Sequence, residues 1–321
     1  MDAMPTTDLV TGAFGFTGSR IAARLLRAQR RVLTLTRRPA GKHPLADRVE
    51  LVAYDFEPGA LRAALNGVDT VYVTMWMRFP RGHATWTQMV DNVTRLAGAA
   101  ADAGARRIVY VSVTNARRDS STAYFRAKAA AEDAVLDAAR RGTISVAIVR
   151  PTLLYGPGDI LINNMAWTLR RLPVFGIPGD GRFLVQPVHV DDVAELCVRL
   201  GAADARVDVD AAGAETLSFN ELVGAVRSAV RSRALVVHLP VPLVLAATRA
   251  LGLVVGDVVL TRDEMRELME SLLVARDPAG TCPTRFTDWI AANGAGTGRR
   301  YSSELARNFR IPRSDHLRAP C

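Results

Sequence analysis

The fold of this chain is decided by a glycine-rich stretch near its N-terminus, Thr11-Gly12-Ala13-Phe14-Gly15-Phe16-Thr17-Gly18 (TGAFGFTG). It lies between a short apolar strand pattern at 8–11 and a helical pattern at 16–29. Glycine at these places permits a tight turn, close approach of the backbone to a pyrophosphate, and close packing of the helix on the strand. The helix N-terminus adds free N–H groups that bind anions. The expected ligand is therefore a dinucleotide, bound by Gly12, Phe14, Gly15, Phe16, Thr17 and Gly18.

Strand and helix patterns alternate through the first half of the chain. Short runs of β-branched and apolar residues predict strands at 8–11, 31–36, 49–54, 69–75, 107–113 and 144–149. Helical spacing predicts helices at 16–29, 61–65, 85–103 and 124–141. This alternation indicates βαβ units with right-handed crossovers. We expect an α/β fold, a Rossmann doubly wound parallel sheet with helices on both faces, in an NAD(P)-binding domain over residues 1–155.

Beyond Arg150 the pattern loosens, because prolines and glycines interrupt it. Thr261 and Glu264 have the spacing of a capping box at a helix start. We expect a smaller, mostly helical substrate-binding lobe over 156–312, interleaved with a sheet that segments within 180–210 complete, and a loose tail over 313–321. Helices are predicted at 191–200, 218–230, 241–251, 261–272 and 286–293.

Two arginines follow the second predicted strand, where the residue that discriminates between NAD and NADP is expected. An acidic residue there would bind the ribose 2′-OH of NAD, whereas Arg37 and Arg38 can hold a 2′-phosphate bidentately. NADP(H) is therefore expected over NAD(H), although two more arginines in an arginine-rich chain are the alternative. Asp55 and Phe56, after the third predicted strand, are placed to contact the adenine, or form an ordinary turn.

Tyr124 and Lys128 form a YxxxK pair on the last predicted helix of the first half. At this spacing the two side chains share one helix face. A neighbouring ammonium stabilises phenolate and so lowers the pKa of a tyrosine, which can then give or take a proton while hydride moves. The lysine can also bind the nicotinamide ribose. A chance pair on a solvated helix is the alternative, and the glycine-rich turn upstream disfavours it.

Composition narrows the function classes. The chain has 41 Lys and Arg against 32 Asp and Glu, a net charge of +9, and Lys42 and Lys128 are its only lysines. The arginines are scattered with no basic run, so no nucleic-acid partner is expected. The cysteines have neither metal-ligand spacing nor a disulfide framework, so we expect no metal and a cytoplasmic location. The apolar stretch at 234–248 is too short and too interrupted to span a membrane.

Taken in order, these motifs resemble the short-chain dehydrogenase/reductase superfamily, in its extended or atypical branch. The resemblance covers about residues 8–200 and is closest to NmrA-like and complex-I-39-kDa-subunit-like members. It rests on TGAFGFTG, Asp55-Phe56, Asn92, RIVYVSV (107–113), YFRAK (124–128), RPTLLYGPGD (150–159) and QPVHVDDVA (186–194).

The resemblance implies further site residues. A Ser or Thr at the end of the fifth strand should bind the substrate carbonyl, but that position falls on Val113, so its neighbours Ser112 and Thr114 both remain candidates. His189 is expected to be a structural hydrogen-bonder, because a lone histidine usually is, and Asp191 is expected to cap the helix that follows it. Cofactor contacts are expected from Thr74, Met75, Lys128, Pro151, Thr152 and Leu153, and substrate contacts from Trp76, Tyr155, Asn163, Asn164 and Trp167.

The resulting hypothesis is an NADPH-dependent oxidoreductase acting on a small, fairly apolar carbonyl or enone. Tyr124 would protonate the developing oxyanion, Lys128 would support Tyr124, and Ser112 or Thr114 would orient the carbonyl. A non-catalytic NADP(H)-binding redox sensor or assembly protein is the alternative that Val113 favours. A sugar-nucleotide epimerase or dehydratase comes third, because the segment between Thr114 and Tyr124 is short. The expected partner is a small-molecule substrate, and a homodimer is left open.

Overall fold

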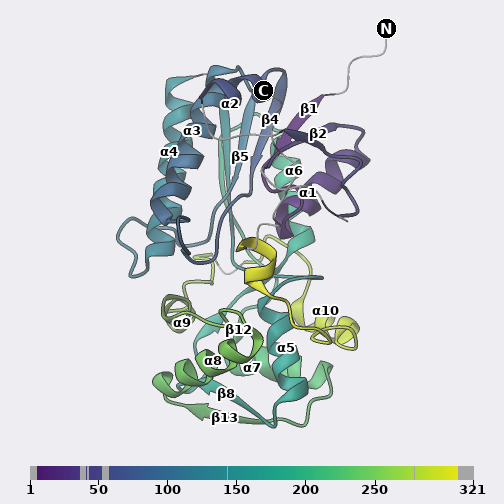
Figure 1. Ribbon diagram of the computed structural model, residues 1–321, viewed down its shortest axis with the longest axis vertical. Helices are drawn as coiled ribbons and strands as arrows, with labels where there is room; N and C mark the ends of the chain where they lie inside the picture. Colours follow the sequence, from purple (N-terminus) through teal and green to yellow (C-terminus); the bar gives the residue numbers. More distant parts are fainter. Residues whose placement is uncertain are drawn as a thin grey trace, which may run out of the picture.

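A seven-stranded parallel sheet forms the upper part of the molecule in Figure 1. The computed structural model describes residues 6–36, 41, 43–52, 58–142, 144–277 and 279–309. The strand order is β11-β6-β5-β4-β1-β2-β3, which confirms the predicted doubly wound Rossmann sheet. The strands are β1 (Thr7–Val10), β2 (Arg31–Leu35), β3 (Glu50–Val52), β4 (Val68–Val73), β5 (Arg107–Val111), β6 (Ser145–Pro151) and β11 (Val207–Ala211).

Helices cover both faces of this sheet, as predicted. One face carries α2 (Pro58–Leu65), α3 (Trp86–Asp102) and α4 (Ala123–Arg141), and the other carries α1 (Phe16–Arg27) and α6 (Val190–Gly201). Because neighbouring side chains of a strand point to opposite faces, Leu9 belongs to the core beneath α2–α4 and Val10 to the core beneath α1 and α6. Burial on both faces explains why the strands read as nearly continuous apolar runs.

Arginines tie the amino edge of the sheet together. Arg30 Nη2 lies 2.7 Å from Asp8 Oδ1, and Arg106 Nε lies 3.0 Å from Asp69 Oδ1. Arg106 Nη2 also donates to the carbonyl oxygen of Gly201 (2.7 Å), at the C-terminus of α6, where a cation is favoured. Part of the positive charge of the chain is therefore used inside the fold.

The rest of the chain forms a second part, below the sheet in Figure 1. Its helices are α5 (Leu161–Arg171), α7 (Phe219–Ala229), α8 (Val241–Val255), α9 (Arg262–Met269), α10 (Phe286–Asn293) and the π-helix η1 (Leu305–Phe309). Its strands pair two by two: β7 (Leu153–Tyr155) with β10 (Pro187–His189), β8 (Val174–Pro178) with β13 (Leu235–Leu239), and β9 (Leu184–Val185) with β12 (Leu217–Ser218).

The sequence predictions for this part are correct in some places and wrong in others. Thr261 and Glu264 do form a capping box at the start of α9. The helix α5 and the short paired strands were not predicted, because flanking prolines and glycines obscure elements this short.

The predicted cap of α6, in the sheet half, is wrong. Asp191 does not cap α6: the cap is His189, whose Nδ1 accepts a hydrogen bond from Asp191 N (3.3 Å). Asp191 lies in the first turn, and its carboxylate pairs with Arg24 of α1 (3.0 Å).

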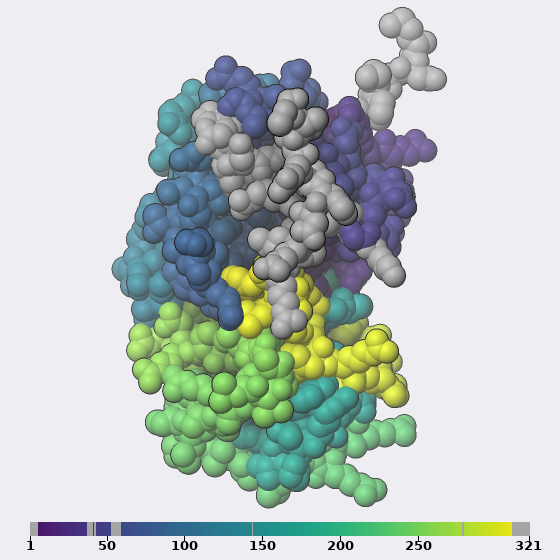
Figure 2. Space-filling model, viewed as in Figure 1, coloured from purple at the N-terminus to yellow at the C-terminus, as the bar shows by residue number. Residues whose placement is uncertain are grey.

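The C-terminal segment returns to the junction between the two parts, as the yellow atoms of Figure 2 show. Phe309 stacks on Phe79, which follows β4, with ring centroids 5.4 Å apart. Tyr301 Oη donates to Asp257 Oδ2 (3.1 Å), at the end of α8. The junction is therefore built from segments that lie far apart in the sequence.

Candidate active site

The glycine-rich turn between β1 and α1 requires glycine at two of its positions. Gly12 has a φ of +66°, a conformation that other residues rarely adopt. A Cβ on Gly18 would lie 2.2 Å from the carbonyl oxygen of Gly12, so any side chain there would push α1 away from the turn. Among the described residues, no side chain caps α1 and no acidic residue occupies its first turn. The N–H groups at this helix start are therefore suited to the phosphates of a dinucleotide.

The end of β4 is joined to this turn. Thr11 Oγ1 accepts hydrogen bonds from Thr74 N (2.9 Å) and Met75 N (3.1 Å), and Thr74 Oγ1 donates to Thr11 O. The structure thus brings Thr74 and Met75 beside the glycine-rich turn, at the point where the strand order of the sheet reverses. Such a switch point is where doubly wound sheets bind their ligands.

Lys128 is buried on α4 and directed toward the end of β5. Its Nζ donates to the carbonyl oxygen of Val111 (2.9 Å) and lies 4.2 Å from the ring centroid of Trp76. The side chain is 3% exposed. Burial lowers the pKa of this ammonium to about 7, although Glu132 opposes the shift.

Tyr124 lies one turn before Lys128, within a cluster of aromatic rings. Its ring centroid is 5.6 Å from that of Trp86 and 6.5 Å from that of Trp76. Burial raises the pKa of Tyr124 above its usual value, and the negative charges of Glu267 and Glu264 raise it further. The prediction that Lys128 lowers the pKa of Tyr124 is therefore wrong. The ammonium of Lys128 makes its hydrogen bond with Val111 and its ring contacts with Trp76 and Tyr110. Burial is the largest influence on the pKa of the Tyr124 phenol.

The chain leaves β5 at Val111, two residues earlier than predicted, so the segment with both candidate hydroxyls is a loop. Ser112 N donates to Val149 O (2.8 Å) and Thr114 N donates to Pro151 O (3.0 Å), which holds this loop against β6. Both side chains are buried, and neither hydroxyl has a hydrogen-bond partner among the described residues. Val113 is buried between them.

Buried polar atoms without a partner recur around this edge of the sheet. In native proteins such atoms are uncommon, and a ligand is one reason for them. Within the described part of the chain, this set includes Trp76 Nε1, Ser112 Oγ, Thr114 Oγ1, Thr122 Oγ1, Thr152 Oγ1 and Glu267 Oε1. They follow β4, β5 and β6 or come from α9, and their donors and acceptors suit a polar ligand.

The remaining predicted residues are placed as follows. Pro151, Thr152 and Leu153 join β6 to β7, beside the end of β5. Phe14 packs against His43, with ring centroids 5.1 Å apart. Phe16 and Thr17 begin α1. Four predicted cofactor residues lie outside the described residues: Arg37, Arg38, Asp55 and Phe56.

Four residues predicted to bind substrate contact the C-terminal segment, residues 284–309. Tyr155 Oη donates to Thr284 O (3.2 Å), and Asn163 Nδ2 donates to Arg300 O (2.9 Å). Trp167 packs against Tyr301, with ring centroids 5.2 Å apart. Asn164 is bound to the same segment, through Ser302. These contacts hold the C-terminal segment against β7 and α5, and a role of the four residues in substrate binding stays a prediction.

Sequence reasoning missed the contribution of α9. Arg78, after β4, pairs with Glu264 of α9, and Arg78 Nη2 donates to Val259 O (2.8 Å). Glu267, one turn further along α9, is buried beside Thr122, and its charge acts on Tyr124. The only sequence signal for the role of α9 was the recurrence of glutamate every third residue from 264 to 270. This spacing shows that the glutamates share one helix face, but it does not show which element packs against that face.

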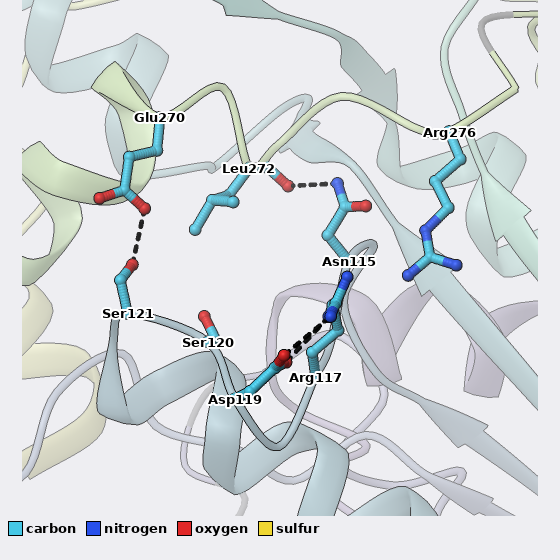
Figure 3. Close-up of a pocket in the computed structure, with 8 residues that line it drawn as sticks. All are labelled: Asn115, Arg117, Asp119, Ser120, Ser121, Glu270, Leu272 and Arg276. Carbon is cyan, nitrogen blue, oxygen red and sulfur yellow. Dashed lines mark hydrogen bonds and ion pairs between the residues drawn. The ribbon is translucent and has the colours of Figure 1, made fainter.

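A pocket of about 270 Å³ lies between the loop before α4 and the segment that follows α9 (Figure 3). Ser121 Oγ donates to Glu270 Oε2 (2.6 Å) on one side of it, and Asn115 Nδ2 donates to Leu272 O (3.0 Å) on the other. None of the predicted site residues lines this pocket. The two hydrogen bonds fix the end of α9 against the start of α4, where Tyr124 lies.

The described residues contain no group of three or more His, Cys, Asp or Glu side chains that could hold a metal ion. In the same residues, no helix has both the length and the apolar character needed to cross a membrane.

Comparisons with known proteins agree with this geometry. Residues 9–210 match the model of the NAD dependent epimerase/dehydratase family. A ceramide reductase of Caulobacter vibrioides is 31% identical over 192 residues, 59% of each chain. The mitochondrial NADH dehydrogenase [ubiquinone] 1 alpha subcomplex subunit 9 of Arabidopsis thaliana is 26% identical over 246 residues, 73% of this chain and 60% of that one. The chain thus spans about three fifths of the length of these two relatives.

Among solved structures, MoeE5 in complex with UDP-glucose and NAD superposes with a TM-score of 0.66 at 23% identity. The superposition covers 90% of this chain and 97% of that one. At this identity the likeness establishes the fold alone.

Proposed function

The chain belongs to the NAD-dependent epimerase/dehydratase family of extended short-chain dehydrogenase/reductases, and from this we propose an NADPH-dependent oxidoreductase acting on a small, fairly apolar carbonyl or enone. The observation that carries the proposal is the pair formed by the half-buried Tyr124 and the buried Lys128, near the end of β5 where Ser112 and Thr114 have hydroxyls without a partner among the described residues. A proton donor, a cation and a carbonyl-binding hydroxyl at the carboxyl edge of a Rossmann sheet are the groups that carbonyl reduction needs. The similarity to a ceramide reductase supports the same reaction class.

The cofactor would be held by the turn over 11–18 and by Thr74, Met75 and the 151–153 connection. When bound, the dinucleotide supplies the hydride. Arg37 and Arg38 support a preference for the 2′-phosphate of NADP(H), on the sequence argument given above. The geometry of Gly12 and Gly18 supports binding of a pyrophosphate by the backbone, because Gly12 has a positive φ that favours glycine and a side chain on Gly18 would collide with the turn.

Tyr124 is the proposed proton donor, and burial keeps its phenol protonated at neutral pH. A phenol that keeps its proton at neutral pH is suited to protonating the oxyanion that forms as a carbonyl is reduced. Lys128 would bind the nicotinamide ribose. Ser112 Oγ or Thr114 Oγ1 would donate a hydrogen bond to the substrate oxygen, since both are buried and unpartnered among the described residues.

Trp76 and Trp86 support an apolar substrate. Their rings are stacked, with centroids 6.2 Å apart and planes at 20°, and both contact the ring of Tyr124. A substrate carbonyl at Tyr124 Oη would therefore have aromatic surface beside it. Ring surface of this kind favours alkyl or flat unsaturated groups.

Val113 supports a second candidate, a non-catalytic NADP(H)-binding sensor or assembly protein. It occupies the position at which the resemblance implies a Ser or Thr, and a mitochondrial NADH dehydrogenase subunit is among the relatives. A sugar-nucleotide epimerase or dehydratase remains third, since α4 begins only a short loop after β5.

The test compares Tyr124→Phe with wild type in dinucleotide oxidation, using NADPH and a panel of medium-chain aldehydes, ketones and enones. We expect wild-type turnover of at least one class and a loss of about a hundredfold or more in kcat for the variant, with NADPH binding retained. Tyr301→Phe is the matched control, because this tyrosine binds Asp257 instead. Binding of NADPH with no turnover of the panel, or equal turnover by Tyr124→Phe, would favour the non-catalytic candidate.

A further inference from the structure

One face of α9 presents three carboxylates to the sheet half of the molecule. Glu264, Glu267 and Glu270 recur every third residue and so lie along one side of the helix. The first pairs with Arg78 (Nη2–Oε2, 3.1 Å), and the last accepts a hydrogen bond from Ser121 Oγ (2.6 Å), as Figure 3 shows. Glu264 is bound to the loop after β4, and Glu270 is bound to the loop before α4. Glu267 lies between these two residues on α9 and therefore faces the sheet half of the molecule as well.

Glu267 differs from these neighbours in having no partner for one of its oxygens. The residue is 7% exposed, and Oε1 has no hydrogen bond within the described part of the chain. The hydroxyl of Thr122 lies beside the carboxyl and lowers its pKa as a donor, but no hydrogen bond of ordinary geometry joins the two groups, so Oε1 is left without a full partner within the described residues. Burial raises the pKa of Glu267 to about 7. A buried acceptor left unsatisfied destabilises the folded protein.

The fold does not require a carboxyl at this position. The start of α9 is capped by Thr261 and Glu264, and its end is fixed by Glu270. Burying a carboxyl without an ion pair is unfavourable unless a ligand satisfies it. A ligand of the site is therefore the natural partner of Oε1.

Glu267 is also close to the residue proposed to protonate the substrate. Thr122 precedes α4 and Tyr124 lies in its first turn, and the charge of Glu267 raises the pKa of Tyr124. Ser112, Thr114 and Tyr124 come from the sheet half, whereas Glu267 comes from the other half. A ligand that reaches both would bridge the two parts of the molecule.

We propose that Glu267 is a substrate-binding residue whose Oε1 accepts a hydrogen bond from a hydroxyl or amide N–H next to the carbonyl that is reduced. The substrate would then be an apolar carbonyl compound with a hydrogen-bond donor beside the reacting group. This inference rests on the proposed function, because it places the carbonyl at Tyr124. It deepens that function by naming what the second part of the molecule recognises.

The test is calorimetric binding of two matched pairs of probes to the full chain, with and without NADP⁺. Octanamide is compared with dimethyloctanamide, which lacks the N–H donors, and octanol is compared with methyl octyl ether, which lacks the O–H donor. We expect at least one donor to bind wild type about tenfold more tightly than its methylated partner. Glu267→Met should reduce this ratio to about one, and the matched control Glu270→Met should keep it.

The proposal is overturned if no probe binds, if both pairs bind wild type without discrimination, or if Glu267→Met keeps the wild-type ratio. A response in the amide pair alone identifies an N–H donor, and one in the alcohol pair alone an O–H donor. Circular dichroism melting checks that the variants fold. Should Glu267→Met not fold, Glu267→Gln, which lacks the negative charge, is expected to lower the ratio, and an unchanged ratio overturns the proposal.

Failure of this inference can be told apart from failure of the proposed function. Binding of the probes needs no turnover, and Tyr124→Phe is expected to keep the donor preference because it retains Glu267. If the protein prefers the donor probes but shows no turnover, substrate binding by Glu267 is supported and the oxidoreductase proposal is not. If the protein shows turnover but no donor preference, the oxidoreductase proposal is supported and the role of Glu267 is overturned.

Discussion

Lys128 donates a hydrogen bond to the carbonyl oxygen of Val111, 2.9 Å away, so that the ammonium of α4 is anchored at the last residue of β5. Trp76 covers the same ammonium, at 4.2 Å from its ring centroid. Lys128 is one of only two lysines in a chain that otherwise uses arginine, and the space it fills suits a compact ammonium. Its pKa near 7 lets it lose its charge in this buried place, which a guanidinium cannot do.

We therefore expect Lys128→Arg to be more damaging to stability than Lys128→Met. The arginine stays charged, is larger, and would be buried without a carboxylate partner, so unfolding should become easier by about 2 kcal/mol or more. Methionine fills a similar volume without a charge and should leave the melting temperature unchanged or raised. Both variants should lose turnover. Chemical denaturation at neutral pH measures the difference, and a Lys128→Arg protein as stable as wild type would contradict this account.

Gly18→Ala should disrupt the start of α1. The added Cβ would lie 2.2 Å from the carbonyl oxygen of Gly12, which is backbone and cannot move aside without shifting the helix. We expect a loss of about 2 kcal/mol or more in the free energy of unfolding, together with weaker dinucleotide binding. Gly98→Ala in α3 is the matched control, because nothing lies within 4 Å of its added Cβ. That control should gain up to about 1 kcal/mol from helix propensity.

Glu267 should make stability depend on pH in a defined direction. Its pKa is raised from 4.5 to about 7 in the folded protein, so between these values the folded state holds a proton that the unfolded state has lost. Wild type should therefore lose stability relative to Glu267→Gln as pH rises from about 4.5 to about 7, by about 3 kcal/mol in all. Above this window the difference should be constant. Urea unfolding of both proteins across the window measures it, and parallel curves would show that the carboxyl is not desolvated.

Arg37→Ala and Arg38→Ala should change the choice of cofactor. If either guanidinium holds the 2′-phosphate, its loss should lower the NADPH-to-NADH affinity ratio by about tenfold or more. Arg31→Ala is the matched control, because that arginine begins β2 and pairs on the surface with Glu50 of the neighbouring strand β3. Fluorescence titration of each reduced dinucleotide gives the ratio. An unchanged ratio in both variants would remove the argument for NADP(H).

Ser112→Ala and Thr114→Val should separate the two candidate carbonyl-binding hydroxyls. Both hydroxyls are buried and unpartnered within the described residues, so removal of either should leave stability nearly unchanged. The one that contacts the substrate oxygen should lose about a hundredfold in kcat/KM when removed, since it is a preorganised donor to developing charge. The other should change kcat/KM by less than about threefold. Equal, small effects in both would favour the non-catalytic candidate.

Local sequence patterns predicted the architecture well. The TGAFGFTG turn and the alternation of strands and helices led to the doubly wound sheet, and the spacing of Tyr124 and Lys128 placed both on α4. These features depend on residues close in the chain, where helix and strand periodicity decide which side chains share a face. The family followed from the same motifs.

The properties of the site were decided by tertiary packing. The pKa of Tyr124 rises rather than falls, because burial and two glutamates from α9 act on the phenol, whereas the ammonium of Lys128 is bound at Val111. Tyr155, which the resemblance made a substrate candidate, binds Thr284, 129 residues later in the chain, a contact that no local pattern indicates. Sequence spacing determines which residues share a helix face. Only the packing of two distant segments determines what lies opposite that face, how much water is excluded there, and hence how strongly each charge acts.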